Sequence, residues 1–278
     1  RMWTLQNISG IWTATLFAQF TGNNFTTFGE DAQGRLYVAS YSSGIIYLVS
    51  DNSDKINLDL NVYLEGPFTG NMMTTGLNAA TEIPLMQPFN TEPWNYNGNE
   101  SVTAIPNTAV VDWVLVELRD APNAATATSV TTIVRKAAFL LSNGKITGLD
   151  GSTNLQFSNS IVNELFVVIW HRNHLGILSA YPLNWTNYVY PYDFSNDADQ
   201  IYGDFSGHKE IAPGIFGMIA GDSDANGLID AADKSNWTME AGLSGYFSSD
   251  FNMDAEINNA DKNEYLIPNE LKFTQVPE

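Results

Sequence analysis

Two acidic segments near the C-terminal end carry oxygen ligands at the spacing of a calcium-binding loop. We call residues 222–233 loop 1 and residues 250–261, which begin 28 positions later, loop 2. Each has Asp or Asn at loop positions 1, 3, 5, 9 and 12, and position 7 offers its backbone carbonyl. A hard divalent cation takes roughly 6–8 oxygen ligands. Two matches in the same register predict two bound Ca²⁺ ions.

The twelve expected ligands follow from these positions. Loop 1 supplies Asp222, Asp224, Asn226, the carbonyl of Leu228, Asp230 through water, and Asp233. Loop 2 supplies Asp250, Asn252, Asp254, the carbonyl of Glu256, Asn258 through water, and Asp261. At position 6 the turn needs a left-handed backbone, which glycine adopts freely and other residues adopt at a cost of roughly 1–2 kcal/mol. Gly227 of loop 1 is replaced by Ala255 in loop 2, so we expect weaker binding at loop 2.

The charge of the chain supports a cation in this region. The formal net charge is −19, and residues 222–278 hold twelve Asp and Glu against three Lys, a net charge of −9. Clustered carboxylates repel one another unless a cation lies between them, so we expect calcium to be needed for this region to fold. A strongly acidic chain is unsuited to nucleic acid or to anionic lipid. The longest apolar run, residues 165–170, is too short to cross a membrane.

Other chemistry finds little support in the sequence. With no cysteine there is no disulfide, thiolate ligand or cysteine nucleophile. We find no Gly-x-Ser-x-Gly motif and no phosphate-binding glycine loop, and we predict no catalytic residues and no enzyme. His171 and His174, three apart on an expected strand, should point to opposite faces. We therefore expect them to hydrogen-bond at the end of a strand and not to bind zinc.

Composition and turn signals predict a mainly β protein. Charged residues are few (15%) and aromatic residues many (12%), as in β-rich extracellular modules. Strands are expected at residues 10–19, 25–28, 36–40, 45–49, 56–64, 110–118, 130–134, 137–141, 145–149 and 165–170, with turns at Gln33-Gly34, Ser43-Gly44 and Asn143-Gly144. Short helices are expected at residues 233–241 and 261–267. These elements predict a β-sheet at residues 1–50, a polar linker at 51–55, an antiparallel β-sandwich at 56–200 and a small α-helical calcium-binding domain at 212–278.

Three stretches resemble known families. Residues 28–47, with Phe28-Gly29-Glu30-Asp31 and Leu36-Tyr37-Val38, resemble the final blade of β-propellers similar to glucose/sorbosone dehydrogenases. Leu64-Glu-Gly-Pro67, residues 110–120 and Met218-Ile-Ala-Gly-Asp222 resemble the C-terminal region of secreted Bacteroidetes-type proteins. The calcium repeats resemble type I dockerins. The resemblance implies a secreted protein in which this region is an accessory part.

We therefore expect a non-catalytic, calcium-binding structural or adhesive protein that is secreted or lies on the cell surface. Open sheet edges at residues 1–50 allow a homo-oligomer or polymer formed by strand addition. One alternative is the accessory C-terminal part of a secreted carbohydrate-active or sugar-oxidising enzyme. Another is a dockerin-type module for a cohesin-like partner, although Ala231-Ala232 and Asn259-Ala260 at loop positions 10 and 11 disfavour it. Aromatic clusters around Trp94 and Trp185 offer a carbohydrate surface, and the first residues, Arg1-Met2-Trp3, suggest a processed product or a fragment.

Overall fold

The chain forms two compact units, Arg1–Asp54 and Lys55–Glu278, which are considered separately. A computed structural model describes residues 2–8, 11–18, 21–22, 24–31, 36–49 and 55–278. The turn predicted at residues 33–34 and residues 51–54 of the linker predicted at 51–55 lie outside the described residues.

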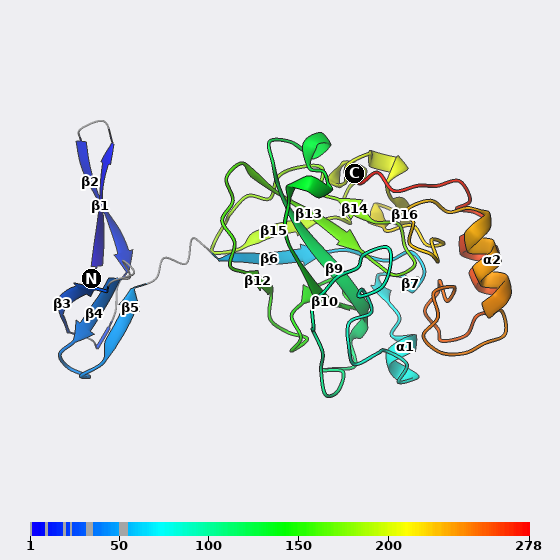
Figure 1. Cartoon of the computed structure of the whole chain (residues 1–278), viewed down its shortest axis with the longest axis horizontal. Coiled ribbons are helices and arrows are strands. Elements are labelled where there is room, and N and C mark those ends of the chain that lie inside the picture. Colours follow the sequence, from blue (N-terminus) through cyan, green and yellow to red (C-terminus); the bar gives the residue numbers. More distant parts are fainter. Residues whose placement is uncertain (1, 9–10, 19–20, 23, 32–35, 50–54) are drawn as a thin grey trace. The chain divides into compact units, whose positions relative to one another are not determined.

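The smaller unit consists of two antiparallel sheets (Figure 1). A hairpin pairs β1 (Met2–Ile8) with β2 (Ile11–Ala18), and a three-stranded sheet has the order β3 (Phe25–Glu30), β4 (Leu36–Ser40), β5 (Ile46–Val49). The predicted turn at Ser43-Gly44 joins β4 and β5, and Gly44 adopts a φ of 68° there. Val38 is buried in this sheet, whereas Phe28, Tyr41 and Ile46 are exposed.

The larger unit is built around two sheets that share one core. The first sheet is antiparallel, in the order β11 (Ile146–Thr147), β10 (Thr132–Leu141), β9 (Val110–Ala121), β13 (Glu164–Trp170), β14 (Ile177–Leu178). The second has the order β12 (Leu155–Phe157), β6 (Ile56–Asn61), β15 (Tyr190–Asp193), with β15 parallel to β6. This mainly β architecture agrees with the predicted β-sandwich, but the second sheet is mixed and not purely antiparallel, because β15 pairs with β6 in parallel.

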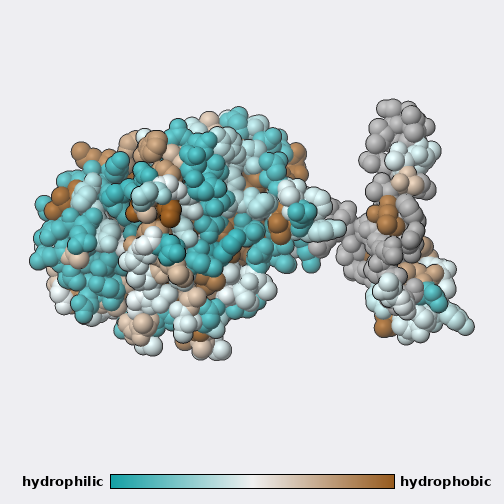
Figure 2. Space-filling model, turned by 180° about the vertical axis from the view of Figure 1, so that it is seen from behind, coloured by the Kyte–Doolittle hydropathy of each residue, from teal (hydrophilic) through white to brown (hydrophobic). Residues whose placement is uncertain are grey.

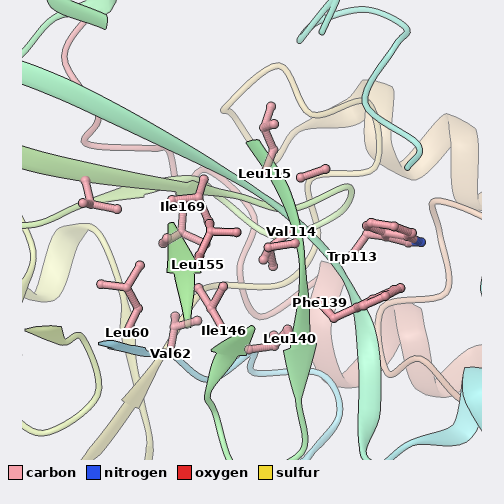
Figure 3. Packing of buried hydrophobic residues seen from close by; sticks show 14 of the residues in the cluster. Leu60, Val62, Trp113, Val114, Leu115, Phe139, Leu140, Ile146, Leu155 and Ile169 are labelled. Carbon is pink, nitrogen blue, oxygen red and sulfur yellow. The ribbon is translucent and has the colours of Figure 1, made fainter. Parts of the chain in front are cut away.

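Strand β9 occupies the centre of the five-stranded sheet, as the apolar residues on both of its faces predict. Figure 3 shows Val114 of β9, Leu140 of β10, Leu155 of β12 and Val62, which follows β6, among the side chains of this buried cluster. All four side chains are at most 3% exposed. The two sheets therefore bury their facing side chains against each other.

Short elements complete the unit. They are β7 (Phe68–Thr69), β8 (Met72–Met73), α1 (Gly76–Ala79), η2 (Ala124–Thr126), η3 (Ser129–Thr131), η4 (Ala198–Gln200), η5 (Asp204–Ser206), β16 (Lys209–Ala212) and β17 (Ile215–Gly217). The two predicted strands at 130–134 and 137–141 form one continuous strand, β10. The surface shown in Figure 2 is mostly hydrophilic on this unit, with hydrophobic residues in separate small patches.

The segment that contains the two loops belongs to the same compact unit as the sheets. Its helical part is α2 (Ala231–Glu240) after loop 1 and a π-helical turn, η6 (Asp261–Leu266), after loop 2. Ile229, Phe251 and Leu266 of this segment share a buried cluster with Leu175 and Ile219, which lie outside the predicted helices and loops. Met239 of α2 is 73% exposed and does not belong to this cluster. Among the described residues, no helix combines the length and the apolar character needed to span a bilayer.

Candidate metal centre

In loop 1 the structure brings together the carboxylates of positions 1, 3 and 12. Oxygen atoms of Asp222, Asp224 and Asp233 all lie within 4.8 Å of one another. Asp222 and Asp233 are buried, and Asp224 reaches the surface. The Oδ1 atom of Asp222 is buried without a hydrogen-bond partner in the protein. Because a buried carboxylate oxygen without a partner is costly, this atom fits a site for a cation.

The carboxylate of position 12 closes loop 1 on itself. Asp233 Oδ1 accepts hydrogen bonds from the N–H groups of Ser223 (2.6 Å) and Asp224 (3.3 Å), and its Oδ2 accepts from the N–H of Asp230 (2.8 Å). The Asp230 side chain in turn accepts from the N–H of Ala232 at 2.7 Å and caps helix α2. The helix start therefore fixes both acidic residues that end the loop.

Loop 2 repeats this arrangement position by position. Asp261 Oδ1 accepts from the N–H groups of Phe251 (2.8 Å) and Asn252 (3.2 Å), and its Oδ2 accepts from the N–H of Asn258 (2.8 Å). The Asn258 side chain accepts from the N–H of Ala260 at 2.7 Å, as Asp230 does in loop 1. Position 3 is the amide Asn252 in place of a carboxylate, so loop 2 offers one negative charge fewer at that position.

Position 6 is left-handed in both loops, as the sequence predicts. Gly227 has a φ of 86° and Ala255 a φ of 70°, and their N–H groups donate to Asp222 and Asp250, each at 3.0 Å. The Ala255 methyl is 6% exposed and belongs to the main core cluster of the sheets. Burial of this methyl, worth about 0.8 kcal/mol, offsets much of the left-handed cost that the sequence argument assigned to Ala255.

Burial raises the pKa values of the four carboxyls at positions 1 and 12. Burial and then the charge of Asp233 raise the pKa of Asp222 to about 8. Burial raises the pKa of Asp250 to about 7, although the charge of Arg172 opposes the shift. The pKa values of Asp233 and Asp261 are also raised, chiefly by burial. Burial thus shifts each of these carboxyls toward its neutral form, and a bound cation would favour the charged form instead.

Loop 2 is held against the five-stranded sheet by the residues that follow β13. The Asn173 amide donates to the carbonyl of Asp250 at 2.7 Å, and the Arg172 guanidinium donates to the carbonyl of Phe247. Arg172 Nε also lies 2.9 Å from Oδ2 of the fully buried Asp112 in β9. Burial, the largest single effect, would raise the pKa of Asp112, but the charges and hydrogen bonds of Arg172 and His171 together lower that pKa.

The histidine pair differs from its sequence-based expectation. β13 ends at Trp170, so His171 and His174 lie in the turn beyond it and do not point to opposite faces. Their Nδ1 atoms are 3.1 Å apart, and both rings are buried. His174 Nε2 accepts from the N–H of Gly66 at 3.3 Å, which assigns the proton to its Nδ1. The expected hydrogen-bonding role at the end of a strand describes the pair, and burial lowers the pKa of His174 well below its usual value.

Loop 1 is held instead by the C-terminal tail, residues 271–278. The N–H of Ile229 donates to the carbonyl of Lys272 at 2.9 Å, and the N–H of Thr274 donates to the carbonyl of Gly227 at 2.8 Å. The Thr274 hydroxyl donates to the carbonyl of Gly176 at 2.7 Å, which ties the tail to the sheet. The two loops thus share one internal geometry but contact different partners.

Sequence reasoning did not single out Asp112, Glu117 or Arg119 as site residues. All three are buried charges within the apolar strand β9. A charged side chain in a strand that is otherwise apolar on both faces is the signal that marks them, because burial of a charge requires a partner.

No protein-family model matches the chain, and no curated protein matches it. Among solved structures, the chain is similar to one chain of a type II cohesin–X-dockerin complex from Acetivibrio cellulolyticus, an N-terminal interface mutant. The identity is 15% and the TM-score 0.39, over 78% of this chain and 97% of that chain. The function of the site therefore rests on its own geometry.

Proposed function

We propose that residues 55–278 form a non-catalytic calcium-binding structural module of a secreted or cell-surface protein. In this proposal each loop binds one Ca²⁺ ion, and the ions fasten the acidic C-terminal segment, a dockerin-like loop pair, onto the β-sheets. The observation that carries the proposal is the repeated pattern of hydrogen bonds around two buried carboxylates in each loop, Asp222 with Asp233 and Asp250 with Asp261.

The donor set of both loops fits Ca²⁺. Loop 1 presents the oxygen atoms of Asp222, Asp224 and Asp233 within 4.8 Å of one another, and one oxygen of Asp222 has no partner in the protein. All the candidate ligand atoms are oxygens. Oxygen ligands favour hard cations such as Ca²⁺ over softer metals. The raised pKa values of Asp222 and Asp250 mean that calcium replaces protons and does not displace an existing ion pair.

Calorimetric titration of the calcium-depleted full chain tests the proposal. We expect two ions per chain, and one ion after either Asp222→Ala or Asp250→Ala. Glu164→Gln removes an exposed acidic charge outside the loops and should leave two. An unchanged stoichiometry in both loop variants would contradict the proposal.

Calcium removal should also lower the stability of the fold. If calcium is present at about 100 times each dissociation constant, each ion contributes roughly 2.7 kcal/mol. For a unit of this size, loss of both ions lowers the melting temperature by roughly 10–20 °C. An unchanged melting curve in a calcium chelator would exclude the structural role.

A second candidate function is a docking module for a cohesin-like partner. It is favoured by three exposed apolar side chains, Leu228, Leu271 and Phe273, where loop 1 and the tail pair as short antiparallel segments. If this surface binds a partner, charged substitutions such as Phe273→Asp should abolish capture of a cohesin domain without changing calcium binding. Retained capture would remove this candidate.

The proposal includes self-assembly through the smaller unit. β3 and β5 are the edge strands of its sheet, and Phe28, Tyr41 and Ile46 are exposed beside them. Light scattering should show species larger than a monomer, and Ile46→Lys should reduce them. A strict monomer with and without calcium would defeat this part.

A further inference from the structure

A pocket of about 210 Å³ lies between the five-stranded sheet, loop 1 and the C-terminal tail. Arg135 of β10 and Glu117 of β9 are directly opposite each other in the register, and both line the pocket. Trp94 and Trp170 also line it, and loop 1 contributes Asn226. The pocket therefore combines two indole rings with a small number of convergent polar groups, which is typical of small-molecule sites.

One of the two arginines in the pocket has its charge compensated and the other does not. Glu117 Oε1 accepts from Arg119 Nε at 2.7 Å, so these two buried charges balance each other. The Arg135 guanidinium donates to the carbonyl of Trp94 at 2.8 Å and forms no ion pair with any residue that the structure describes. Glu117 and Glu278 also line the pocket, so its two arginines are matched by two acidic residues. Arg135 is the lining cation that has no ion pair among the described residues, and its guanidinium can therefore bind the carboxylate of a ligand.

The remaining polar groups suit hydroxyls. Glu117 Oε2 accepts one hydrogen bond, from Trp170 Nε1 at 3.2 Å, and retains capacity for a second donor. The Asn226 amide also lines the pocket, and its Nδ2 donates one hydrogen bond, to Asp224, which leaves a second N–H for a ligand. The Thr274 hydroxyl lines the pocket too, but it already donates to the carbonyl of Gly176. A ligand that carries both a carboxylate and several hydroxyls matches this set better than a peptide carboxylate, which offers no hydroxyl donors to Glu117.

The indole rings supply the apolar surface. A Cβ at Gly176 would lie 2.3 Å from Cε3 of Trp170, so the backbone covers part of this ring while the side chain stays partly exposed. Trp94 meets Phe89 edge-on, with ring centroids 5.0 Å apart, and is also partly exposed. Tyr96, grouped with Trp94 in the sequence as a carbohydrate surface, is instead buried in the core and does not line the pocket.

We propose that this pocket binds one sugar ring that bears a carboxylate, a hexuronic acid residue. Its carboxylate pairs with Arg135, its hydroxyls bond to Glu117 and Asn226, and the C–H face of the ring packs on Trp94 and Trp170. A volume of about 210 Å³ lies below the usual range for drug-sized ligands and suits a single ring.

Calcium shapes this pocket, a statement that rests on the proposed function of loop 1. Asn226 is both the position 5 ligand and a lining residue, and Gly227 beside it accepts the hydrogen bond from Thr274 that positions the tail. Calcium at loop 1 therefore orders one wall of the pocket, whereas calcium at loop 2 does not touch it.

Titration of the full chain with galacturonic acid in the presence of calcium tests the pocket, with the Trp170 Nε1–H NMR signal as the local readout. Galactose has a similar ring without the carboxylate, and acetylated diglycine has a carboxylate without the ring hydroxyls. We expect galacturonic acid to shift the signal and to bind at least about tenfold tighter than either control. Equal binding of galactose, tighter binding of the dipeptide, or no binding of galacturonic acid overturns the proposal.

Substitutions of lining residues test whether the sugar binds in this pocket. Arg135→Gln should weaken binding at least about tenfold and Arg135→Lys should weaken it less, because the lysine keeps the charge. Trp94→Ala should abolish binding, and Trp185→Ala, which removes an exposed tryptophan outside the pocket, should not change it. Unchanged melting temperatures of the Arg135 variants show that they remain folded, and wild-type affinity in folded Arg135→Gln contradicts the proposal.

Substitutions at position 3 of each loop test whether sugar binding depends on calcium at loop 1. Asp224→Ala should reduce sugar binding, and Asn252→Ala should leave it unchanged. Calcium is titrated separately without sugar. If the chain binds two calcium ions but no sugar, the proposal for the pocket is wrong and the proposed function stands. If the chain binds sugar but no calcium, the proposed function is wrong.

Discussion

The Tyr246 hydroxyl lies 2.7 Å from Oδ1 of Asp112, so the segment between the two loops is bonded to the central strand of the sheet. Asp112 is fully buried, and its other oxygen accepts from Arg172. The Arg172 guanidinium also lies over the Tyr246 ring, 4.2 Å from its centroid. These three residues form the polar junction between loop 2 and the sheets.

Removal of one partner in this junction should destabilise the larger unit. Tyr246→Phe deletes a hydrogen bond to a buried charge, and we expect a loss of about 1.5–3 kcal/mol in the free energy of unfolding, measured by urea denaturation. Tyr188→Phe, at a side chain that is 73% exposed, should change it by less than about 0.5 kcal/mol. Equal effects of the two substitutions would show that the Tyr246–Asp112 hydrogen bond does not stabilise the larger unit.

Exchange of the residue at position 6 should affect loop 1 more than loop 2. Gly227→Ala places a side chain at a φ of 86° with its Cβ 2.7 Å from Thr274 Cγ2, and should weaken calcium binding at loop 1 about tenfold. Ala255→Gly removes the left-handed cost but also a buried methyl worth about 0.8 kcal/mol, so we expect little net change in stability. Calorimetric titration and thermal melting of both variants measure this. Tighter calcium binding by Gly227→Ala would refute the argument.

Replacement of Gly66 should destabilise the larger unit, because the backbone of loop 2 lies directly against this residue. A Cβ there would lie 1.7 Å from the carbonyl oxygen of Phe251 in loop 2, so Gly66→Ala forces loop 2 away from the sheet. We expect a loss of more than about 3 kcal/mol and reduced calcium affinity at loop 2. At Gly148 the added Cβ meets atoms no closer than 3.4 Å, and Gly148→Ala serves as the control. Wild-type melting of Gly66→Ala would show that the contact is absent.

Stability without calcium should fall as the pH rises. The carboxyls of Asp222 and Asp250 have pKa values of about 8 and about 7 in the fold, against 3.8 as the ordinary value. Between these limits the folded chain keeps protons that the unfolded chain has lost, so its stability declines as the pH rises through the folded pKa values. If calcium replaces these protons, as we propose, its stabilising effect should be larger at about pH 8 than at about pH 5. Melting curves with calcium and with chelator at both values test this, and a larger calcium effect at the lower pH would contradict it.

The elements that the sequence predicted best are those with a local cause. β9 is apolar on both faces and is the central strand, and β4 has the predicted bounds. The left-handed backbone at position 6 of both loops was predictable because it is a local feature of a twelve-residue stretch. The helix after loop 1 begins two residues before its predicted start, because Asp230 caps it.

What the sequence could not supply is the set of long-range partners. The 212–278 segment was predicted as a separate domain, but Phe251 and Leu266 share a core with Leu175. The histidines were placed on a strand, but β13 ends one residue earlier and the turn brings their rings together.

The sequence by itself determined that oxygen ligands recur at calcium spacing in two loops, because that pattern depends only on neighbours along the chain. Only the tertiary structure decided which parts of the fold each loop contacts. Loop 2 is fixed to the sheet through Gly66, Arg172 and Asn173, and loop 1 borders a pocket with Arg135 and two tryptophans. The physical reason is that burial, pKa shifts and the fit of backbone against backbone arise from residues far apart in sequence.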